Sequence, residues 1–517
     1  MSMPMRAARQ ETLPPDDRAF FGHPRGLSTL FFTEMWERFS YYGMRGFLIL
    51  YIAAPAAVGG MGLDTAAAAA IYGTYTSMVY LVSLPGGWIA DRLIGQRRAV
   101  MYGGILIAAG HFSLAVPTVT MFYVGLTVIV LGTGLLKPNI SVIVGQLYSQ
   151  QDLRRDAAFS LFYMGINMGA FFGPVVTGFL AQSETFRSMI AGWGLDPNSA
   201  WHWGFGAAGV GMTLGVVQYV LGSRHLGSAG LHPAPAASPR EAASLKQAAL
   251  IWIGGGMLVL MALGIAIATG MLPVTPEQVT GAYAYVLLAV TLVFFGWLFF
   301  AGSWTPIERK RLYIIGVFFI AAALFWSVFE QAGSTLNLFA DRSTSNVIFG
   351  YEFPSSWWQS VNALLIFALA PVFAWIWLTW GVNQPASPTK FSLGLIAVGL
   401  GFVVLIPAAQ MASGGAQVGV IWLFLVYVIH TLGELCLSPV GLSSMTKLAP
   451  TKIVSLMMGV WFLGASVGNF LGGQAASFYE SMPLPQLLGA VALLPIAAGI
   501  AMLIFRKPLT ELMGGVR

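Results

Sequence analysis

The sequence has few charged residues and almost no cysteine. Only 9% of its 517 residues are Asp, Glu, Lys or Arg and 57% are apolar, whereas an ordinary soluble domain carries roughly 25% charged residues. So few charges cannot cover a soluble protein of this size, and lipid must therefore be much of the solvent. The single cysteine, Cys436, excludes an intrachain disulfide and most cysteine-based metal sites. The polar stretch 1–27 shows no cleavable signal peptide.

Long apolar stretches, in contrast, recur along the chain. Runs of about 20 apolar residues have the length that crosses a bilayer as a helix, and they predict fourteen transmembrane helices here. The expected spans are 28–53, 67–90, 98–116, 119–148, 156–181, 201–222, 247–270, 280–302, 312–338, 357–382, 391–408, 416–445, 454–480 and 485–506. An even number of spans places both termini on the same side of the membrane.

The basic residues indicate which side that is. Of the 26 Lys and Arg residues, 21 lie in the tails and connections on the side of the termini, and only Arg187 and Arg342 lie on the opposite face. Because cytoplasmic connections are enriched in Lys and Arg, we expect both termini in the cytoplasm. This topology and its contact with anionic lipid account for the net charge of +6, so nucleic acid is not an expected partner.

The predicted spans fall into two sets of six. A stretch rich in Pro, Ala and Ser from Gly227 to Pro239 interrupts the apolar pattern, and two helices with almost no internal polar residues follow it. We expect those two helices to serve for packing or lipid contact. The expected parts are a cytoplasmic tail 1–27, a six-helix bundle 28–226, a linker 227–246, two additional helices 247–302, a cytoplasmic loop 303–311, a second bundle 312–507 and a tail 508–517.

The two sets of six share a pattern of glycines. Glycine recurs at every fourth position in the fifth helix of each set, at Gly165, Gly169 and Gly173 and again at Gly464, Gly468 and Gly472. Each run alone indicates only close helix packing. Pro138 and Pro439 precede the runs at similar distances, and we expect each proline to break its helix. The matched placement predicts parallel repeats with a site between them near the middle of the bilayer, as in major-facilitator transporters.

Seven charged side chains lie inside the predicted spans. They are Arg38, Arg45, Lys137, Glu34, Glu37, Glu330 and Glu434. A charge at mid-bilayer costs at least about 2.5–3.5 kcal/mol, so we expect these groups to face one shared polar cavity. In span 28–53, Glu34, Arg38, Tyr41 and Arg45 lie within about 40° of one line along a helix. Carboxylates beside arginines in such a cavity can gain and lose protons, which suits proton-coupled alternating access.

Several segments carry a specific resemblance to a known family. They are EMWERFSYYG at 34–43, GWIADRLIGQRR at 87–98, GLLKPN at 134–139, FYMGINMG at 162–169, FWSVFEQ at 325–331, GELCLSP at 433–439 and WFL at 461–463. Together they resemble the proton-dependent oligopeptide transporters, the POT or PTR family of the major facilitator superfamily, in the bacterial form with two additional helices. The resemblance covers roughly residues 26–507.

The resemblance implies the fold and the activity. The fold would be an all-α polytopic membrane protein of the major-facilitator type, with two six-helix bundles, two extra helices and both termini cytoplasmic. The chain would carry di- and tripeptides into the cell by proton-coupled symport and alternating access. It would be a multi-pass protein of the inner (plasma) membrane, not an enzyme, with the proton as coupling ion and no cofactor or metal. We expect a monomer.

The resemblance also implies roles for single residues. Proton coupling would involve Glu34, Glu37, Arg38 and Glu330. The carboxylate of the peptide would meet Tyr41, Arg45, Tyr80 and Lys137. Its amino group would meet Asn167, Asn362 and Glu434, and its side chains would enter apolar pockets lined by Trp326 and Trp461. Glu330 would pair with Arg45 or Lys137 as a gate between the two halves.

Other interpretations of these residues remain open. Tyr80, Asn167 and Asn362 are also typical of polar bridges between helices, and the two tryptophans of helix packing. His430 lies one turn before Glu434, but two ligands are too few for a metal site. Two positions depart from the family pattern, since Phe329 stands where some relatives have an acid and Gly73 where animal members have histidine.

Two other functions compete with peptide transport. The chain could carry nitrate or another small solute with protons, or act as a nutrient sensor without flux. A carboxylate at Glu434 repels an anion but suits an ammonium, which argues against nitrate. A sensor would be expected to lack the charged stripe that this sequence retains.

Overall fold

The computed structural model describes residues 17–149, 151–234, 238–256, 258–259, 262, 266, 271–450 and 453–515. Its helices are α1 (Arg25–Ala53), α2 (Thr65–Leu81), α3 (Ser83–Ile89), α4 (Gln96–Leu114), α5 (Val119–Gln146), α6 (Arg154–Gln182), α7 (Glu184–Gly192), α8 (Ala200–Gly222), α9 (Pro239–Ala249), α11 (Pro276–Gly296), α12 (Pro306–Phe329), α13 (Thr335–Ser343), α14 (Trp358–Trp380), α15 (Ser387–Ala412), α16 (Ile421–Leu448), α17 (Val454–Ala476), α18 (Leu484–Ile504) and α19 (Arg506–Leu512). One small hairpin pairs β1 (Val347–Ile348) with β2 (Tyr351–Glu352) in antiparallel register.

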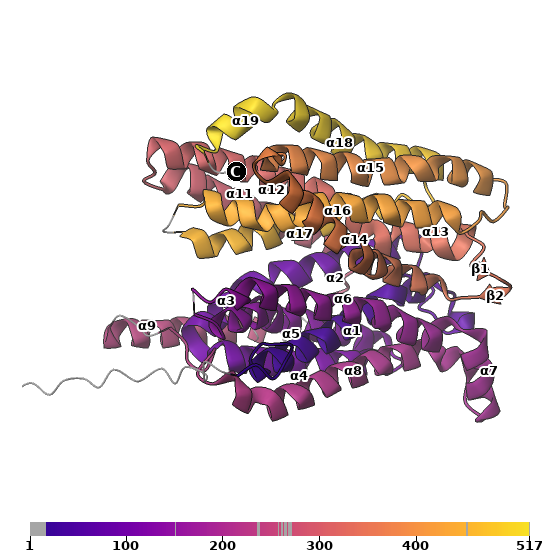
Figure 1. Cartoon of the computed structure of the whole chain (residues 1–517). Coiled ribbons are helices and arrows are strands. Elements are labelled where there is room, and N and C mark those ends of the chain that lie inside the picture. The colour runs from indigo at the N-terminus through magenta and orange to yellow at the C-terminus, as the bar shows by residue number, and fades with distance from the viewer. Residues whose placement is uncertain are drawn as a thin grey trace, which may run out of the picture.

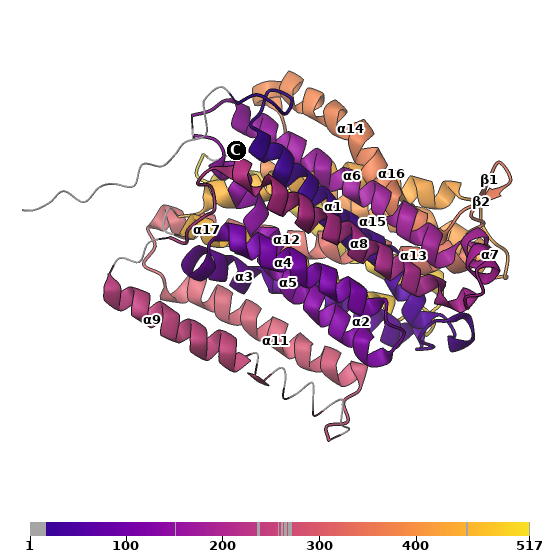
Figure 2. The same ribbon diagram turned by 90° about the horizontal axis from the view of Figure 1, so that it is seen from below.

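The helices form two groups that follow the order of the chain. Helices α1 to α8 lie in one layer and α12 to α18 in the other (Figure 1). Helices α9 and α11, from the middle of the chain, lie along one edge of the assembly (Figure 2). Helix α11 packs on α2, where Thr280 Oγ1 lies 3.2 Å from Thr74 Oγ1 and Tyr283 lies 2.7 Å from Ser77 Oγ. These contacts agree with the expected packing role of the second additional helix.

The membrane spans follow the apolar pattern. Ten helices in the described residues are long and apolar enough to cross a bilayer. Helix α1 is as long, at 29 residues, but its internal charges keep it out of that set. Helices α4 and α17 lie alongside the others (Figures 1 and 2). The expected span 247–270 lies partly outside the described residues. The all-α architecture and the two groups of helices confirm the fold class predicted from the sequence.

Local sequence signals set where helices begin. Helix α12 starts with a capping box, in which Thr305 Oγ1 accepts from the Glu308 amide at 3.3 Å and the Glu308 carboxylate accepts from the Thr305 amide at 2.8 Å. Pro306 occupies the first turn, where a missing amide hydrogen costs nothing. This start fixes the register of the helix that carries Trp326 and leads into Glu330.

The two glycine runs make equivalent contacts in the two groups. The first run packs α6 on α1, where a Cβ at Gly169 would overlap the carbonyl oxygen of Met35 and stand 2.7 Å from the Phe39 amide nitrogen. The second run packs α17 on α12, where a Cβ at Gly468 would stand 2.7 Å from the Ala323 carbonyl oxygen. Only glycine permits such close backbone contact. The same helix pairing in both groups supports parallel repeats.

The expectation that a proline breaks the helix before each run is wrong. Helix α5 continues through Pro138 and helix α16 continues through Pro439. In a membrane helix the backbone groups released by proline can be satisfied by neighbouring helices and side chains, so the helix need not end.

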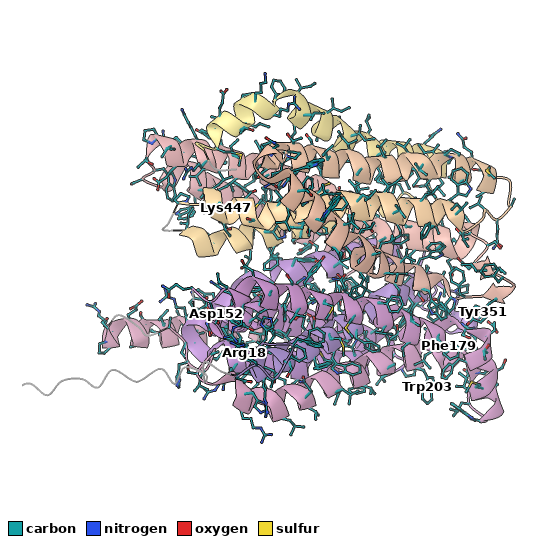
Figure 3. All side chains as sticks on the ribbon, in the orientation of Figure 1. Arg18, Asp152, Phe179, Trp203, Tyr351 and Lys447 are labelled. Carbon is teal, nitrogen blue, oxygen red and sulfur yellow. The ribbon has the colours of Figure 1, made fainter. Side chains whose placement is uncertain are left out.

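The two ends of the assembly differ. Helices α7 and α13 and the β1–β2 hairpin lie at one end, and the C-terminus, α9 and α19 lie toward the other (Figure 1). Phe179, Trp203 and Tyr351 mark the first end, and Arg18, Asp152 and Lys447 mark the second (Figure 3). Arg187 in α7 and Arg342 in α13 therefore share one end, as the distribution of basic residues predicts. We refer to it as the outer end.

Candidate functional site between the two halves

Helix α1 carries a buried unit of two carboxylates and one arginine. Arg38 donates from Nη2 to Glu37 Oε1 at 2.6 Å and also from Nε to Glu37 Oε2. Its Nε lies 3.3 Å from Glu34 Oε1. All three residues are at most 4% exposed. Glu34 Oε2 has no hydrogen-bond partner among the described residues, so one carboxylate oxygen of this unit is open to a proton.

A second ion pair joins the two halves. Arg45 Nη2 lies 2.5 Å from Glu330 Oε2, and the same nitrogen donates to the Glu330 carbonyl oxygen at 3.3 Å. Glu330 opens the short turn Glu330–Gly333 after α12, so the pair links the first half to the second. Both residues are at most 5% exposed. Glu330 was expected to pair with Arg45 or Lys137, and in the structure it pairs with Arg45.

Tyr72 belongs to this site although the sequence did not single it out. Its hydroxyl accepts a hydrogen bond of 2.6 Å from Arg45 Nε. Gly333 makes room for this contact, because a Cβ there would stand 2.9 Å from Arg45 Nε and would overlap the Tyr72 hydroxyl. The available signal was a polar side chain inside the apolar run of α2. That run contains several other polar residues, so the signal was not specific.

Lys137 is a cation without a carboxylate partner among the described residues. Its Nζ lies 3.7 Å from the centre of the Tyr80 ring and 5.9 Å from that of Phe462. In the part of the chain that the structure describes, no acidic oxygen lies within 4.0 Å of it. Tyr80 on α2 and Lys137 on α5 are thus brought together, whereas the pairing of Lys137 with Glu330 is not found.

A carboxylate lies in the second half. Asn362 on α14 donates from Nδ2 to Glu434 Oε2 at 3.0 Å and to Thr431 Oγ1 at 3.1 Å. No Lys or Arg nitrogen of the described chain lies within 4.0 Å of Glu434. Asn167 on α6 donates instead to the Tyr163 carbonyl of its own helix at 2.9 Å. The structure therefore joins two of the three residues expected at the amino group of a peptide.

Aromatic side chains occupy the adjoining part of the second half. The rings of Trp326 on α12 and Trp461 on α17 lie 6.3 Å apart, edge to face at 84°. The Trp326 indole nitrogen is buried and has no hydrogen-bond partner in the residues described. Phe329 lies 5.4 Å from Trp326 and 6.1 Å from His430. The departure at position 329 thus replaces an acid by a ring that completes an aromatic cluster.

His430 and Tyr41 are each held inside one half. The ring of His430 bonds through Nε2 to the Val398 carbonyl oxygen at 3.0 Å, which gives this histidine a structural partner. The Tyr41 ring lies 5.1 Å from the guanidinium carbon of Arg38. Its hydroxyl is buried without a hydrogen-bond partner in the described chain. That hydroxyl is therefore available to a substrate or a water molecule.

The hydrogen bonds and ion pairs between the halves that we find in the described chain lie toward the outer end. Thr65 Oγ1 in the first half donates to Glu480 Oε1 at 2.5 Å and accepts from Arg342 Nη2 at 3.0 Å. Asn337 Nδ2 donates to the Gly46 carbonyl oxygen at 2.8 Å. The deepest hydrogen bond joins Ser77 and Ser466, about 18 Å along α2 from its outer end. The structure is therefore closed at the outer end.

Comparison with known proteins places these features in context. The family model described as the POT family matches residues 97–488. The peptide transporter YePEPT of Yersinia enterocolitica subsp. palearctica is 40% identical over 522 residues, which cover 98% of each chain. A di-/tripeptide transporter of Lactococcus lactis subsp. cremoris is 36% identical over 98% of this chain and 100% of the relative. The crystal structure of a peptide transporter POT in complex with sulfate is 42% identical, covers 98% of both chains and has a TM-score of 0.87.

Proposed function

This chain belongs to the POT family, and we propose that it carries di- and tripeptides into the cell together with protons. It is a multi-pass protein of the inner membrane and not an enzyme. Two relatives that match nearly the whole chain are named a peptide transporter and a di-/tripeptide transporter. The proposal extends that activity to this chain and assigns the coupling ion and the residues.

The observation that carries the proposal is a separation of unpaired charge between the halves. Lys137 in the first half has no carboxylate partner, and Glu434 in the second half is held by an amide and has no cationic partner in the described chain. Each charge is costly inside a membrane unless a counter-charge reaches it. A peptide supplies an ammonium at one end and a carboxylate at the other. One zwitterionic substrate therefore satisfies both groups.

The remaining site residues fit around such a substrate. We propose that Arg45, Tyr41 and Tyr80 join Lys137 around the carboxylate of the peptide, since their donors suit a carboxylate. Asn362 orients Glu434 toward an ammonium, and we propose that Asn167 approaches that end when substrate is bound. Trp326 and Trp461 offer apolar surface to the side chains between the two termini. Because the termini are read by charge and the side chains by apolar contact, many short peptides would be accepted.

We propose that the two buried ion-paired units carry the proton coupling. Glu34 and Glu37 both contact the guanidinium of Arg38. When one acid is protonated, the other can still form an ion pair with Arg38. Protonation of Glu330 would remove the charge that pairs with Arg45. The outer ends of the halves could then separate, and Arg45 would be released toward the peptide carboxylate. In this scheme the proton and the peptide act on the same gate.

Alternating access would move the two halves as units. We propose that the bundles 28–226 and 312–507 rock against each other, with the tail 1–27, the linker 227–246, the helices 247–302, the loop 303–311 and the tail 508–517 outside the moving site. Opening the outer end requires the Arg45–Glu330 pair and the contacts around Glu480 to break. All the proposed site residues come from one chain, so we propose a monomer as the transporting unit and no cofactor beyond the coupling proton.

Nitrate transport and a sensor without flux are less well supported. Nitrate would leave Glu434 without a counter-charge and would add a second anion to the shared site. A sensor has no need of the buried Glu34–Glu37–Arg38 unit, which is complete here.

Uptake by the purified chain in liposomes tests the proposal. Labelled dialanine should accumulate above its external concentration when the outside is more acidic, and a protonophore should abolish this accumulation. Excess unlabelled trialanine should compete, whereas excess nitrate should not. Accumulation that ignores the proton gradient would refute the coupling, and nitrate competition without peptide uptake would favour the alternative solute.

A further inference from the structure

A cavity lies between the outer ends of the two halves. Its volume is about 320 Å³, and its walls come from the ends of α1, α6 and α8 and from α7 in the first half, and from α13 in the second. Leu50 and Ala54 in its wall follow Arg45 by five and nine positions, which places the cavity about 8–13 Å outward of the Arg45–Glu330 pair. It is therefore separate from the transport site described above.

Three charged residues line this cavity, and two of them are engaged. Arg342 donates from Nη1 to Glu480 at 2.6 Å and from Nη2 to Thr65 at 3.0 Å. Asp341 accepts from the Ser355 hydroxyl at 2.8 Å. Arg187 and Arg342 are also the two basic residues that the sequence places on the outer face. Both basic residues of that face therefore line the cavity, and only Arg187 is still without a described role.

Arg187 offers an unused donor. Its Nε is buried and has no hydrogen-bond partner in the part of the chain described. The nearest carboxylate, Glu184, lies 3.9 Å away on a side chain that is 88% exposed, which makes this a weak surface pair. The Trp201 ring lies 5.9 Å from the guanidinium carbon and supports one side of it. The guanidinium is thus held at a cavity wall with a free edge.

We propose that this cavity binds a small organic acid through Arg187, and that the bound acid holds the outer ends of the two halves together. A guanidinium edge matches a carboxylate in shape and charge. Ligand cavities commonly measure about 300–1,000 Å³, so this one suits a molecule near the size of an amino acid. Because both halves build the walls, the cavity exists as one site only while the outer end is closed. A ligand that binds one state shifts the population toward it.

A bound acid would regulate uptake from outside the central site. An acid bound here would oppose outer opening, and it would slow uptake without competing for the central site. Asp341 on the opposite wall would also tolerate an ammonium, so a free amino acid is the simplest occupant. The site would then reduce uptake when small acids are abundant outside the cell.

The distance across the outer end tests this directly. Spin labels are attached at Leu195→Cys, 46% exposed in the first half, and at Phe349→Cys in the fully exposed β1–β2 hairpin, in a Cys436→Ala background. Distance distributions of the full-length protein in detergent are then measured with N-acetylalanine, alanine or alaninamide. N-acetylalanine and alanine, which carry a carboxylate, should shift the population toward the short distance of the closed state. Alaninamide, which has none, should not.

Variants at Arg187 separate this site from the central one. Arg187→Gln should abolish the shift, and Arg309→Gln, an exposed arginine at the other end, should preserve it. If Arg187→Gln fails to fold, Arg187→Lys serves instead. Lysine lacks the two parallel N–H donors of a guanidinium, so the apparent affinity for N-acetylalanine should fall roughly tenfold or more. A full response in either Arg187 variant, or an equal response to alaninamide, would overturn the proposal. Dialanine uptake by the same preparations shows separately whether the proposed transport function holds.

Discussion

Gly73 of α2 and Gly473 of α17 meet backbone to backbone across the two halves. A Cβ at Gly73 would stand 2.6 Å from the Cα of Gly473, and a Cβ at Gly473 would stand 2.5 Å from the Cα of Gly73. Neither backbone can yield as a flexible side chain would. The contact therefore requires glycine on both sides. Because it joins the two halves, we expect it to break when the outer end opens.

Gly73→Ala should therefore destabilise the closed outer end. We expect Leu50→Cys, a position that is 5% exposed here, to react with an external maleimide several-fold faster in the Gly73→Ala background. Gly206→Ala in α8 is the matched control, because a Cβ there meets its nearest neighbour at 3.8 Å, an ordinary contact. Equal labelling rates in the two backgrounds would show that the contact does not control outer opening.

Glu434→Ala should nearly abolish the binding of free dialanine. The ammonium of the peptide would lose its counter-charge in a low-dielectric site, where removing one partner of a buried pair costs about 3–5 kcal/mol, or more than a hundredfold in affinity. N-acetyldialanine has no ammonium to lose and should change much less. Competition binding of both ligands to the purified variant measures this, and an equal loss for both would contradict the ammonium assignment.

Lys137→Ala should show the mirror pattern at the other end of the peptide. Its ammonium lies over Tyr80 without a carboxylate partner in the described chain, so the variant removes a group available to the peptide carboxylate. The affinity for free dialanine should fall strongly, and the affinity for dialanine amide should fall only slightly. Since Glu330 pairs with Arg45 and not with Lys137, the gate should remain intact in this variant.

The two tryptophans should select for bulky side chains. Trp326 and Trp461 lie edge to face at 6.3 Å, and burial of an aromatic side chain against them contributes roughly 1–3 kcal/mol. Trp326→Ala and Trp461→Ala should therefore weaken diphenylalanine more than dialanine, whose methyl groups cannot use that surface. Competition binding with both peptides checks this. Equal losses would mean that the tryptophans only hold α12 and α17 together.

Several of these contacts could be predicted from the sequence because they are local. Glu34 and Arg38 stand four positions apart on one helix, and this spacing alone brings them together. The glycine runs likewise predicted close packing, because they need only a partner backbone. The matched positions of the runs then predicted parallel repeats, but they did not say that α1 and α12 would be the partner helices.

Contacts between the halves were harder to predict. Arg45 and Glu330 are 285 positions apart, and whether Arg45 or Lys137 would reach Glu330 depends on how the turn after α12 packs on α1. Tyr72, Thr65 and Glu480 were missed because single polar residues at helix ends and inside apolar runs have many other uses. Asn167 can bond to its own backbone, so its residue type alone did not fix where its side chain points.

Glu37→Gln should separate coupling from exchange. The glutamine amide can still bond to Arg38 but cannot accept and release a proton. Only one of the two acids beside Arg38, Glu34, could then change its protonation. Accumulation of dialanine driven by a proton gradient should be lost, whereas counterflow between equal internal and external pools should persist, because exchange moves no net proton. Concentrative uptake in this variant would remove Glu37 from the coupling mechanism.

The most direct test of proton-coupled peptide transport is the proton movement that dialanine itself causes. Liposomes containing the protein and a trapped pH indicator are set at equal pH inside and outside, with the membrane potential clamped at zero, and dialanine is added outside. If protons and dialanine enter together, the interior should acidify as dialanine enters, and N-acetylated dialanine amide should cause little change. Dialanine entry at an unchanged internal pH would contradict it.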